Sequence, residues 1–319
     1  MDYTKIVSRA WDIVKTNRYL WWLGILAGFG GSSAGMRWYN FGGSHSRTTP
    51  PNSPGLDQSM RAFQDMVAAN APILVWVGIL LVIFIFCALY ISYAAQAGLI
   101  LSADAIEHKK KSHTFREAYR SGRPFAWRLF GMHVLLNLAM LGVFFILVSL
   151  AFILLLVAAG PGNLSGLDVA FGLLGIILFV IVVVVMVFLV SLVLELGKRA
   201  LVLNDSTITD AIIKAKELLY YEFTSAFFAS LVNSIVVMLA AIMFMIALLV
   251  SVGLLVAIGL MFFAFSTMLG LAYCLVASLA VVAALFTIGG LLCAYQSVYW
   301  TLSYEAIAYL AHHKKKSKE

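Results

Sequence analysis

The feature that most constrains this chain is an uncharged run that covers residues 223–304. It contains no Asp, Glu, Lys, Arg, His or Pro, and Ser, Thr, Asn and Gln are only scattered through it. An apolar stretch of about 18 or more residues without charges is typical of a membrane-spanning helix, and this run is several times longer. We therefore expect this part of the chain to lie within a lipid bilayer.

The composition of the whole chain supports the same environment. Its 319 residues are 62% hydrophobic and 12% charged, whereas soluble domains are typically about 45–50% apolar and about 25% charged. The net charge of +7 is concentrated in blocks between apolar runs, which is a signal of membrane topology. We therefore predict a polytopic integral membrane protein, and we expect no nucleic-acid partner.

The positions of the basic residues predict how the chain threads through the membrane. Nineteen of the 22 Lys and Arg residues lie before the first apolar run, in residues 104–128 and 195–222, or in the tail at 310–319. The other three are Arg37, Arg47 and Arg61. Because cytoplasmic loops carry the excess of positive charge, both termini are expected in the cytoplasm of a prokaryotic cell, with the protein in its cytoplasmic (inner) membrane.

Two cytoplasmic termini require an even number of spans, and the hydropathy predicts six. The fold class is thus an all-α transmembrane bundle, with residues 1–319 as one domain and residues 36–70 as an extracytoplasmic loop. Gly24 and Gly28 have the spacing of small residues that lets helix backbones approach closely. The run at 223–304 supplies two spans, with an apolar turn within residues 253–270. The other four spans are expected at 19–35, 72–101, 125–159 and 167–196.

Amphipathic segments precede three of the spans and predict three cytoplasmic surface helices. Residues 1–18 form the first, with an apolar stripe and an opposite face that carries basic residues. The second and third begin at Thr114 and Thr207, each followed three residues later by an acid, which is the pattern of a capping box. Such helices suit the surface of an anionic membrane.

Short sequence matches predict an internal repeat. Residues 101–106 read Leu-Ser-Ala-Asp-Ala-Ile, and residues 302–307 read Leu-Ser-Tyr-Glu-Ala-Ile. Each match stands where an inward span ends, so the unit is a surface helix, an outward span and an inward span. The pattern predicts three such units, at about residues 1–106, 109–205 and 206–309, which is a common construction for membrane proteins.

A few short segments carry a resemblance to a known family: Ala10, Trp11, Asn17, Leu20–Gly24, the Thr207, Asp210 and Ala211 step, and the motif at 302–307. These segments resemble a broad group of prokaryotic six-span membrane proteins. That group includes the membrane domain attached to some glycerophosphoryl diester phosphodiesterases, in which the chemistry resides in a separate soluble barrel domain. The resemblance implies the fold and the membrane location, and without a barrel domain in this sequence it does not imply the activity.

Few residues in the predicted spans could carry chemistry. None of the common catalytic, phosphate-binding or dinucleotide-binding motifs is present, so we expect no enzymatic activity, no metal site and no cofactor. His133 is a weak candidate for a single axial ligand to a pigment or haem. A bis-histidine haem would need a second His at similar depth, so an ordinary packed or interfacial histidine is the simpler interpretation.

Polar residues at membrane depth define the remaining candidate contacts. The amides could form interhelical hydrogen bonds or line a polar cavity; these residues are Gln96, Asn137, Asn233 and Gln296. Glu195 lies three and four residues before Lys198 and Arg199 on one helical face. That group is either an ion pair that anchors the helix or, together with Lys109, Lys110 and Lys111, a set of contacts to lipid headgroups.

Three functions remain open from the sequence. The first is a non-enzymatic membrane protein that acts by contact, as a scaffold or accessory subunit or by organising lipid, with lipid, another membrane protein or a second copy as its partner. The second is a permease-like carrier for a lipid or apolar small molecule, with a cavity lined by the four amides. The third is a cofactor- or pigment-binding bundle that uses His133.

Overall fold

The computed structural model describes residues 1–28, 71–108, 114–158 and 166–316, and these residues are helical with no strand. Five of the helices in these ranges are long and apolar enough to cross a membrane, which confirms the helical membrane-protein class. The predicted loop at 36–70 lies outside the described residues. The helices are α1 (Tyr3–Thr16), α2 (Tyr19–Gly28), α4 (Ala71–Glu107), α5 (Phe115–Gly122), the 3-10 turn η2 (Arg123–Phe125), α6 (Ala126–Ala158), α7 (Gly166–Leu203), α8 (Ile208–Phe265) and α9 (Thr267–Lys316).

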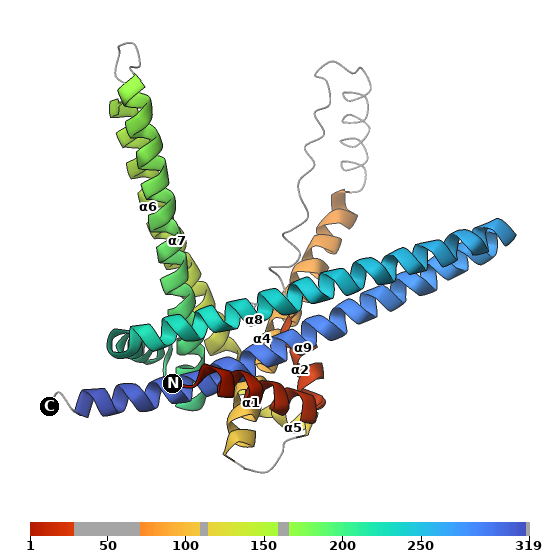
Figure 1. Ribbon diagram of the computed structural model, residues 1–319, viewed down its shortest axis with the longest axis horizontal. Coiled ribbons are helices and arrows are strands. Elements are labelled where there is room, and N and C mark those ends of the chain that lie inside the picture. Colours follow the sequence, from red (N-terminus) through yellow and green to blue (C-terminus); the bar gives the residue numbers. More distant parts are fainter. Residues whose placement is uncertain (29–70, 109–113, 159–165, 317–319) are drawn as a thin grey trace.

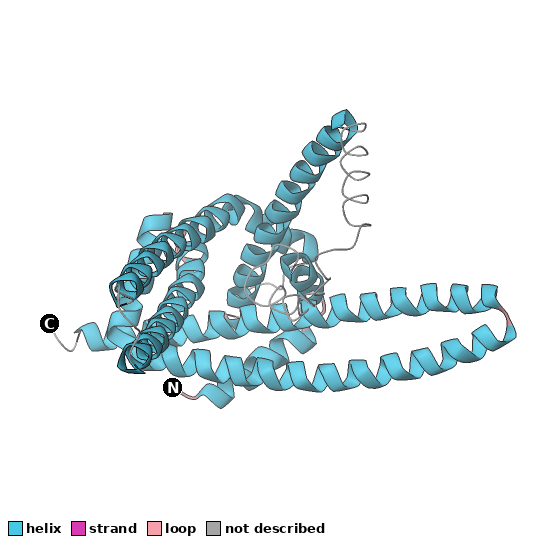
Figure 2. Ribbon diagram, turned by 90° about the horizontal axis from the view of Figure 1, so that it is seen from above, coloured by secondary structure: helices cyan, strands magenta, loops and turns pink. Residues whose placement is uncertain are grey.

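The uncharged run forms most of a helical hairpin. Helices α8 and α9 lie side by side over most of their length (Figures 1 and 2), and the turn between them is at Ser266, whose backbone is extended. The turn falls within the predicted 253–270. Helix α8 has one break, at Glu222 (φ −133°, ψ 44°), which divides its amphipathic start from its apolar part. The apolar part, residues 223–265, is about 65 Å long at 1.5 Å per residue.

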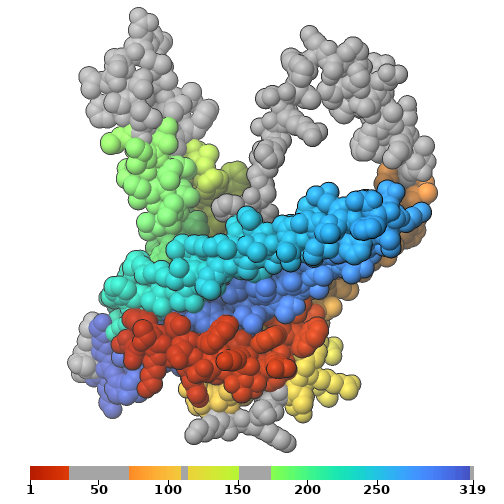
Figure 3. All heavy atoms as spheres, turned by 45° about the vertical axis from the view of Figure 1, so that its right-hand side comes forward, coloured from red at the N-terminus to blue at the C-terminus, as the bar shows by residue number. Residues whose placement is uncertain are grey.

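The long helices converge at one end only. We call this region the junction: residues 90–107 of α4, 126–133 of α6, 192–203 of α7, 208–233 of α8 and 290–307 of α9, with the short helices α1, α2 and α5 packed against them. Figure 1 shows three arms leaving it in different directions: α4, the α6–α7 pair and the α8–α9 hairpin. Figure 3 shows α1 and α2 lying across the hairpin. The buried core lies at the junction and includes Ala97, Leu196, Ala200, Ala294 and Val298.

The short helices on the junction begin as the sequence predicts. Asp2 caps α1 by accepting hydrogen bonds from the Lys5 amide (3.2 Å) and the Thr4 hydroxyl (2.8 Å), and these bonds lower the pKa of its carboxyl. At Thr114 the backbone N–H donates to Glu117 (3.0 Å) in a capping box. At the third predicted start, the hydroxyl of Thr207 accepts from the amide of Asp210 (3.3 Å). These caps confirm the starts of all three surface helices.

The end of the chain ties α9 back to α8. Helix α9 continues through the predicted basic tail as far as Lys316. Lys315 pairs with Glu217 at 2.9 Å, and Lys314 pairs with Glu222 at 3.1 Å. The second pair lies at the break in α8, so the tail holds the amphipathic start of α8 against α9.

Small residues allow the closest helix contact at the junction. A Cβ on Gly24 would meet the backbone carbonyl of Gly290, and a Cβ on Gly290 would meet Ile25 and the carbonyl of Trp21. The prediction of close backbone packing is therefore confirmed at Gly24. At Gly28, by contrast, a Cβ would meet no described atom within 4 Å.

Gly290→Ala is expected to destabilise the protein by about 1–3 kcal/mol, the usual cost of overpacking a tight contact. Gly289→Ala is the matched control, because the space around its Cβ position is open and Ala is the better helix former. The free energy of unfolding of the purified protein in detergent measures both effects. Equal losses in the two variants would contradict the packing of α2 on α9.

Candidate functional site

Three ionisable side chains lie on one turn of α7 inside the junction. The spacing of Glu195, Lys198 and Arg199 places them on one face of the helix, and α4 and α9 cover that face. Their exposed fractions are 8%, 2% and 3%. Charged side chains are almost never so deeply buried unless they are paired, so their partners decide whether the arrangement is stable.

A single carboxylate pairs with both cations. The Lys198 ammonium donates to Glu195 Oε1 at 3.3 Å, and Arg199 Nη1 donates to Glu195 Oε2. Arg199 also reaches two carbonyls, that of Glu195 with Nη1 at 2.8 Å and that of Ser297 on α9 with Nη2 at 3.5 Å. One carboxylate and two cations leave a formal charge of +1 in a buried part of the protein.

A small cavity of about 20 Å³ adjoins this group. Helices α4, α7 and α9 all contribute to its wall, so it exists only because the three helices meet here. Two of the four predicted amides, Gln96 and Gln296, line it together with the ionic group. The other lining residues are Ile100, Cys293, Ser297 and Trp300.

Several polar atoms at this cavity have no hydrogen-bond partner among the described residues. They are Arg199 Nε, Gln96 Oε1 and Ser297 Oγ, and each residue is at least nine-tenths buried. A buried polar atom without a partner costs about 1–3 kcal/mol. The protein atoms that line this cavity therefore leave some of its buried polar groups without hydrogen bonds.

The other candidate residues do not join this cavity. Asn233 on α8 is buried at the junction, and its Oδ1 has no partner in the described part of the chain. Asn137 is exposed, and its amide donates to the His133 carbonyl of the same helix at 2.7 Å. The ring of His133 packs edge-on against Tyr93, with the ring centroids 5.8 Å apart, as in the simpler interpretation of a packed histidine.

The predicted headgroup contacts divide into two sets. Lys109, Lys110 and Lys111 lie outside the described residues. Glu195, Lys198 and Arg199 face the protein interior, so a headgroup could reach them only through the cavity. Their role in binding lipid stays a prediction, whereas the ion pairing within the group is explicit in the structure.

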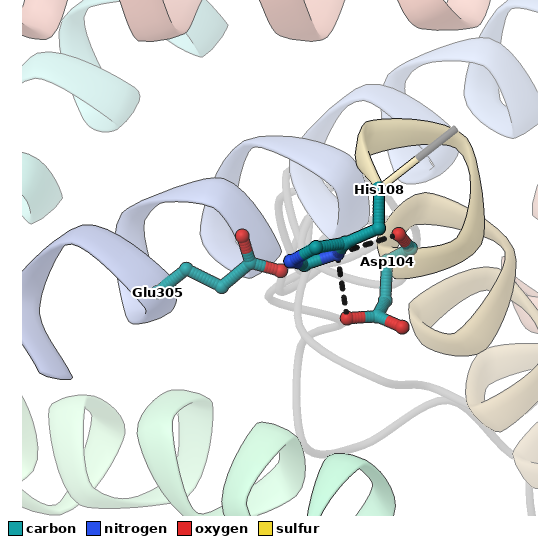
Figure 4. A group of neighbouring side chains, drawn as sticks. All are labelled: Asp104, His108 and Glu305. Atoms are coloured by element: carbon teal, nitrogen blue, oxygen red, sulfur yellow. Dashed lines mark hydrogen bonds and ion pairs between the residues drawn. The ribbon is translucent and has the colours of Figure 1, made fainter. Parts of the chain in front are cut away.

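A second polar group lies at the same end of the protein, between α4 and α9. Asp104, His108 and Glu305 bring one potential metal-ligand atom each to within 4.8 Å of one another. His108 Nδ1 lies 3.0 Å from the Asp104 carbonyl and 3.3 Å from its Oδ1, and the other ring nitrogen points toward Glu305 (Figure 4). The group can join the two helices through a protonated imidazole or hold a cation, a site that the sequence did not predict.

Sequence reasoning missed the α9 wall of the cavity. Cys293, Gln296, Ser297 and Trp300 recur at intervals of three and four residues, which is the spacing of one helical face. Only Gln296 stood out, because a lone Ser, Cys or Trp in an apolar helix is common. That periodicity was the one signal that could have identified this face.

Comparisons with protein families, with curated proteins and with solved structures find no match for this chain. The resemblance to the phosphodiesterase membrane domain therefore stays a prediction that depends on the quoted residues. The function has to be argued from the junction and the arms.

Glu195→Gln is expected to cost about 3–5 kcal/mol of stability, because it leaves two buried cations without a counter-charge. Glu107→Gln is the control, since Glu107 pairs with Arg9 at 3.1 Å where both side chains are partly exposed and such pairs contribute about 0–1 kcal/mol. Thermal unfolding in detergent compares the two. A similar small loss in both variants would show that the α7 group is hydrated.

Proposed function

We propose that this protein is a non-enzymatic integral membrane protein that acts by contact, organising the lipid around its three arms. In this proposal six helices span a prokaryotic cytoplasmic membrane, both termini are cytoplasmic, and the junction lies at the cytoplasmic face. In a scaffold or accessory role, a partner membrane protein would cover part of the arms in place of lipid.

The exposed apolar surface of the arms is the observation that carries the proposal. In the most apolar windows of the five long helices, at most 6% of the residues are buried within the protein. Helices that pack mainly on one another would bury one face along their length. In the part of the chain that the structure describes, most buried residues lie at the junction ends, and the arms have to be covered by lipid or by the helices of a partner.

The length of the α8–α9 arm favours lipid as the covering partner. Its apolar part in α8 is about 65 Å long, roughly twice the ~30 Å hydrocarbon layer. Tilts of membrane helices reach about 40°, and the remaining mismatch is relieved by changes in local bilayer thickness. A helix pair of this length would therefore thicken or reorganise the bilayer near it.

The junction carries groups that suit a headgroup layer. Exposed cations on the short helices include Lys5, Arg9 and Lys15 on α1 and Lys214 on α8, and clusters of this kind attract anionic lipid. Exposed aromatic side chains, which favour the interface, lie at the same end: Trp11, Trp22, Trp127 and Tyr220.

The threefold repeat fits this arrangement. Residues 101–106 and 302–307 both end in the junction, and their acids Asp104 and Glu305 lie in one polar group. Residues 196–201 of α7 read Leu-Gly-Lys-Arg-Ala-Leu and occupy the corresponding place. The small residue in second position is buried in all three segments, as Ser102, Gly197 and Ser303. We infer that three related units converge here, each contributing one arm.

Shortening the α8–α9 arm tests the lipid proposal. A variant that lacks residues 256–276 keeps the junction but brings the hairpin closer to the bilayer thickness. Reconstitution into bilayers of increasing acyl-chain length is expected to raise the thermal stability of the full chain steadily, because mismatch decreases. The shortened variant should reach its maximum in thinner bilayers. An identical dependence in both proteins would contradict the proposal, as would the absence of co-purifying lipid in mild detergent.

A permease-like function is the second candidate, because Gln96 and Gln296 meet at a polar cavity. At about 20 Å³ the cavity is far smaller than a lipid, so transport would require the arms to separate. We expect proteoliposome flux of a fluorescent lipid to be unaffected by replacing both glutamines with Leu. Flux that falls in this double variant but not in Asn137→Leu would favour the permease over the contact function.

A further inference from the structure

We propose that the cavity at the junction binds one small monovalent anion of halide size, held by Arg199, Lys198 and Ser297. This site is independent of the lipid proposal, because it depends only on the charges and donors that α7 and α9 place together.

The balance of charge favours a second anion. Lys198 and Arg199 are 2% and 3% exposed, and among the described residues Glu195 is the carboxylate that pairs with them. Both of its oxygens are already occupied, one by each cation. An uncompensated charge in a low-dielectric interior is costly, and a monovalent anion would bring the formal charge of the group to zero.

The unused hydrogen-bond donors point to the same ligand. Arg199 Nε and Ser297 Oγ are buried and have no partner among the described residues, although each carries a hydrogen to donate. The Lys198 ammonium has three hydrogens to donate, and one of them is used in its hydrogen bond to Glu195. Gln96 lines the same cavity, and its NH₂ group would become a further donor if the amide were rotated by 180°. A halide accepts several such donors at once.

The size of the cavity suits a ligand with a single heavy atom. A cavity needs about 10–15 Å³ to hold one water-sized particle, and this one measures about 20 Å³. A phosphate or carboxylate group has several heavy atoms and is larger than this space. A water molecule fits but leaves the formal charge of +1, so an anion is the better occupant.

Occupancy would act on the contact between helices. The cavity wall comes from α4, α7 and α9, and each of these helices belongs to a different arm. An anion at this point ties the three arms together where they meet. Its removal should loosen the junction without changing the helical content.

Halide titration of the purified full chain tests the site. At constant ionic strength, chloride or bromide in place of gluconate should raise the midpoint of thermal unfolding, with saturation, because a ligand that binds only the folded state stabilises it. Crystals soaked in bromide should show an anomalous peak beside Arg199 and Ser297. No halide-specific stabilisation and no peak in the cavity would overturn the proposal and leave water as the occupant.

Arg199→Gln removes the excess charge and should abolish the halide-dependent rise. Arg128→Gln is the matched control, because Arg128 forms a solvent-exposed pair with Asp205 at 2.7 Å, and it should keep the full rise. Ser297→Ala loses one donor at little cost in volume, so it should weaken the apparent halide affinity about tenfold or more. If Arg199→Gln does not fold, Ser297→Ala and the bromide peak decide the question, and an unchanged affinity would overturn the proposal.

Discussion

Close packing of small residues at the junction is the constraint on which the rest of the structure depends. In a bilayer, apolar helices gain little by leaving lipid for one another, so association requires close backbone approach or polar contacts. Gly24 and Gly290 bring α2 and α9 together in this way, and Gly98 and Gly122 do the same for α4 and α5. The three arms diverge beyond these contacts (Figure 1), while within the hairpin α8 and α9 also pack closely at Gly259 and Gly270.

The buried group on α7 gives the junction its polar interior. Two cations share one carboxylate, and a small cavity with unused donors lies beside them. Burying charge adds little net stability and is often unfavourable compared with an apolar core. The retention of this group at the meeting point of three helices therefore favours a binding role, which the halide proposal makes specific.

Lipid would act on the arms, whereas the anion would act on the junction. The apolar surface of the α8–α9 arm is longer than the bilayer is thick. The lipid or partner helices that surround the arms would determine their orientation in the membrane. The junction determines whether the arms are held together at one end.

The sequence by itself determined the environment, the helical class, the turn within 253–270 and the helix starts at Thr114 and Thr207. These features depend on local hydropathy and on caps that act within a few residues. The tertiary structure alone decided that Gln96 and Gln296 meet while Asn137 does not, that Glu195, Lys198 and Arg199 face inward, and that Asp104 lies beside Glu305. The physical reason is that helices apolar on all sides give no signal of which face is buried, so only their packing assigns each polar side chain its neighbours.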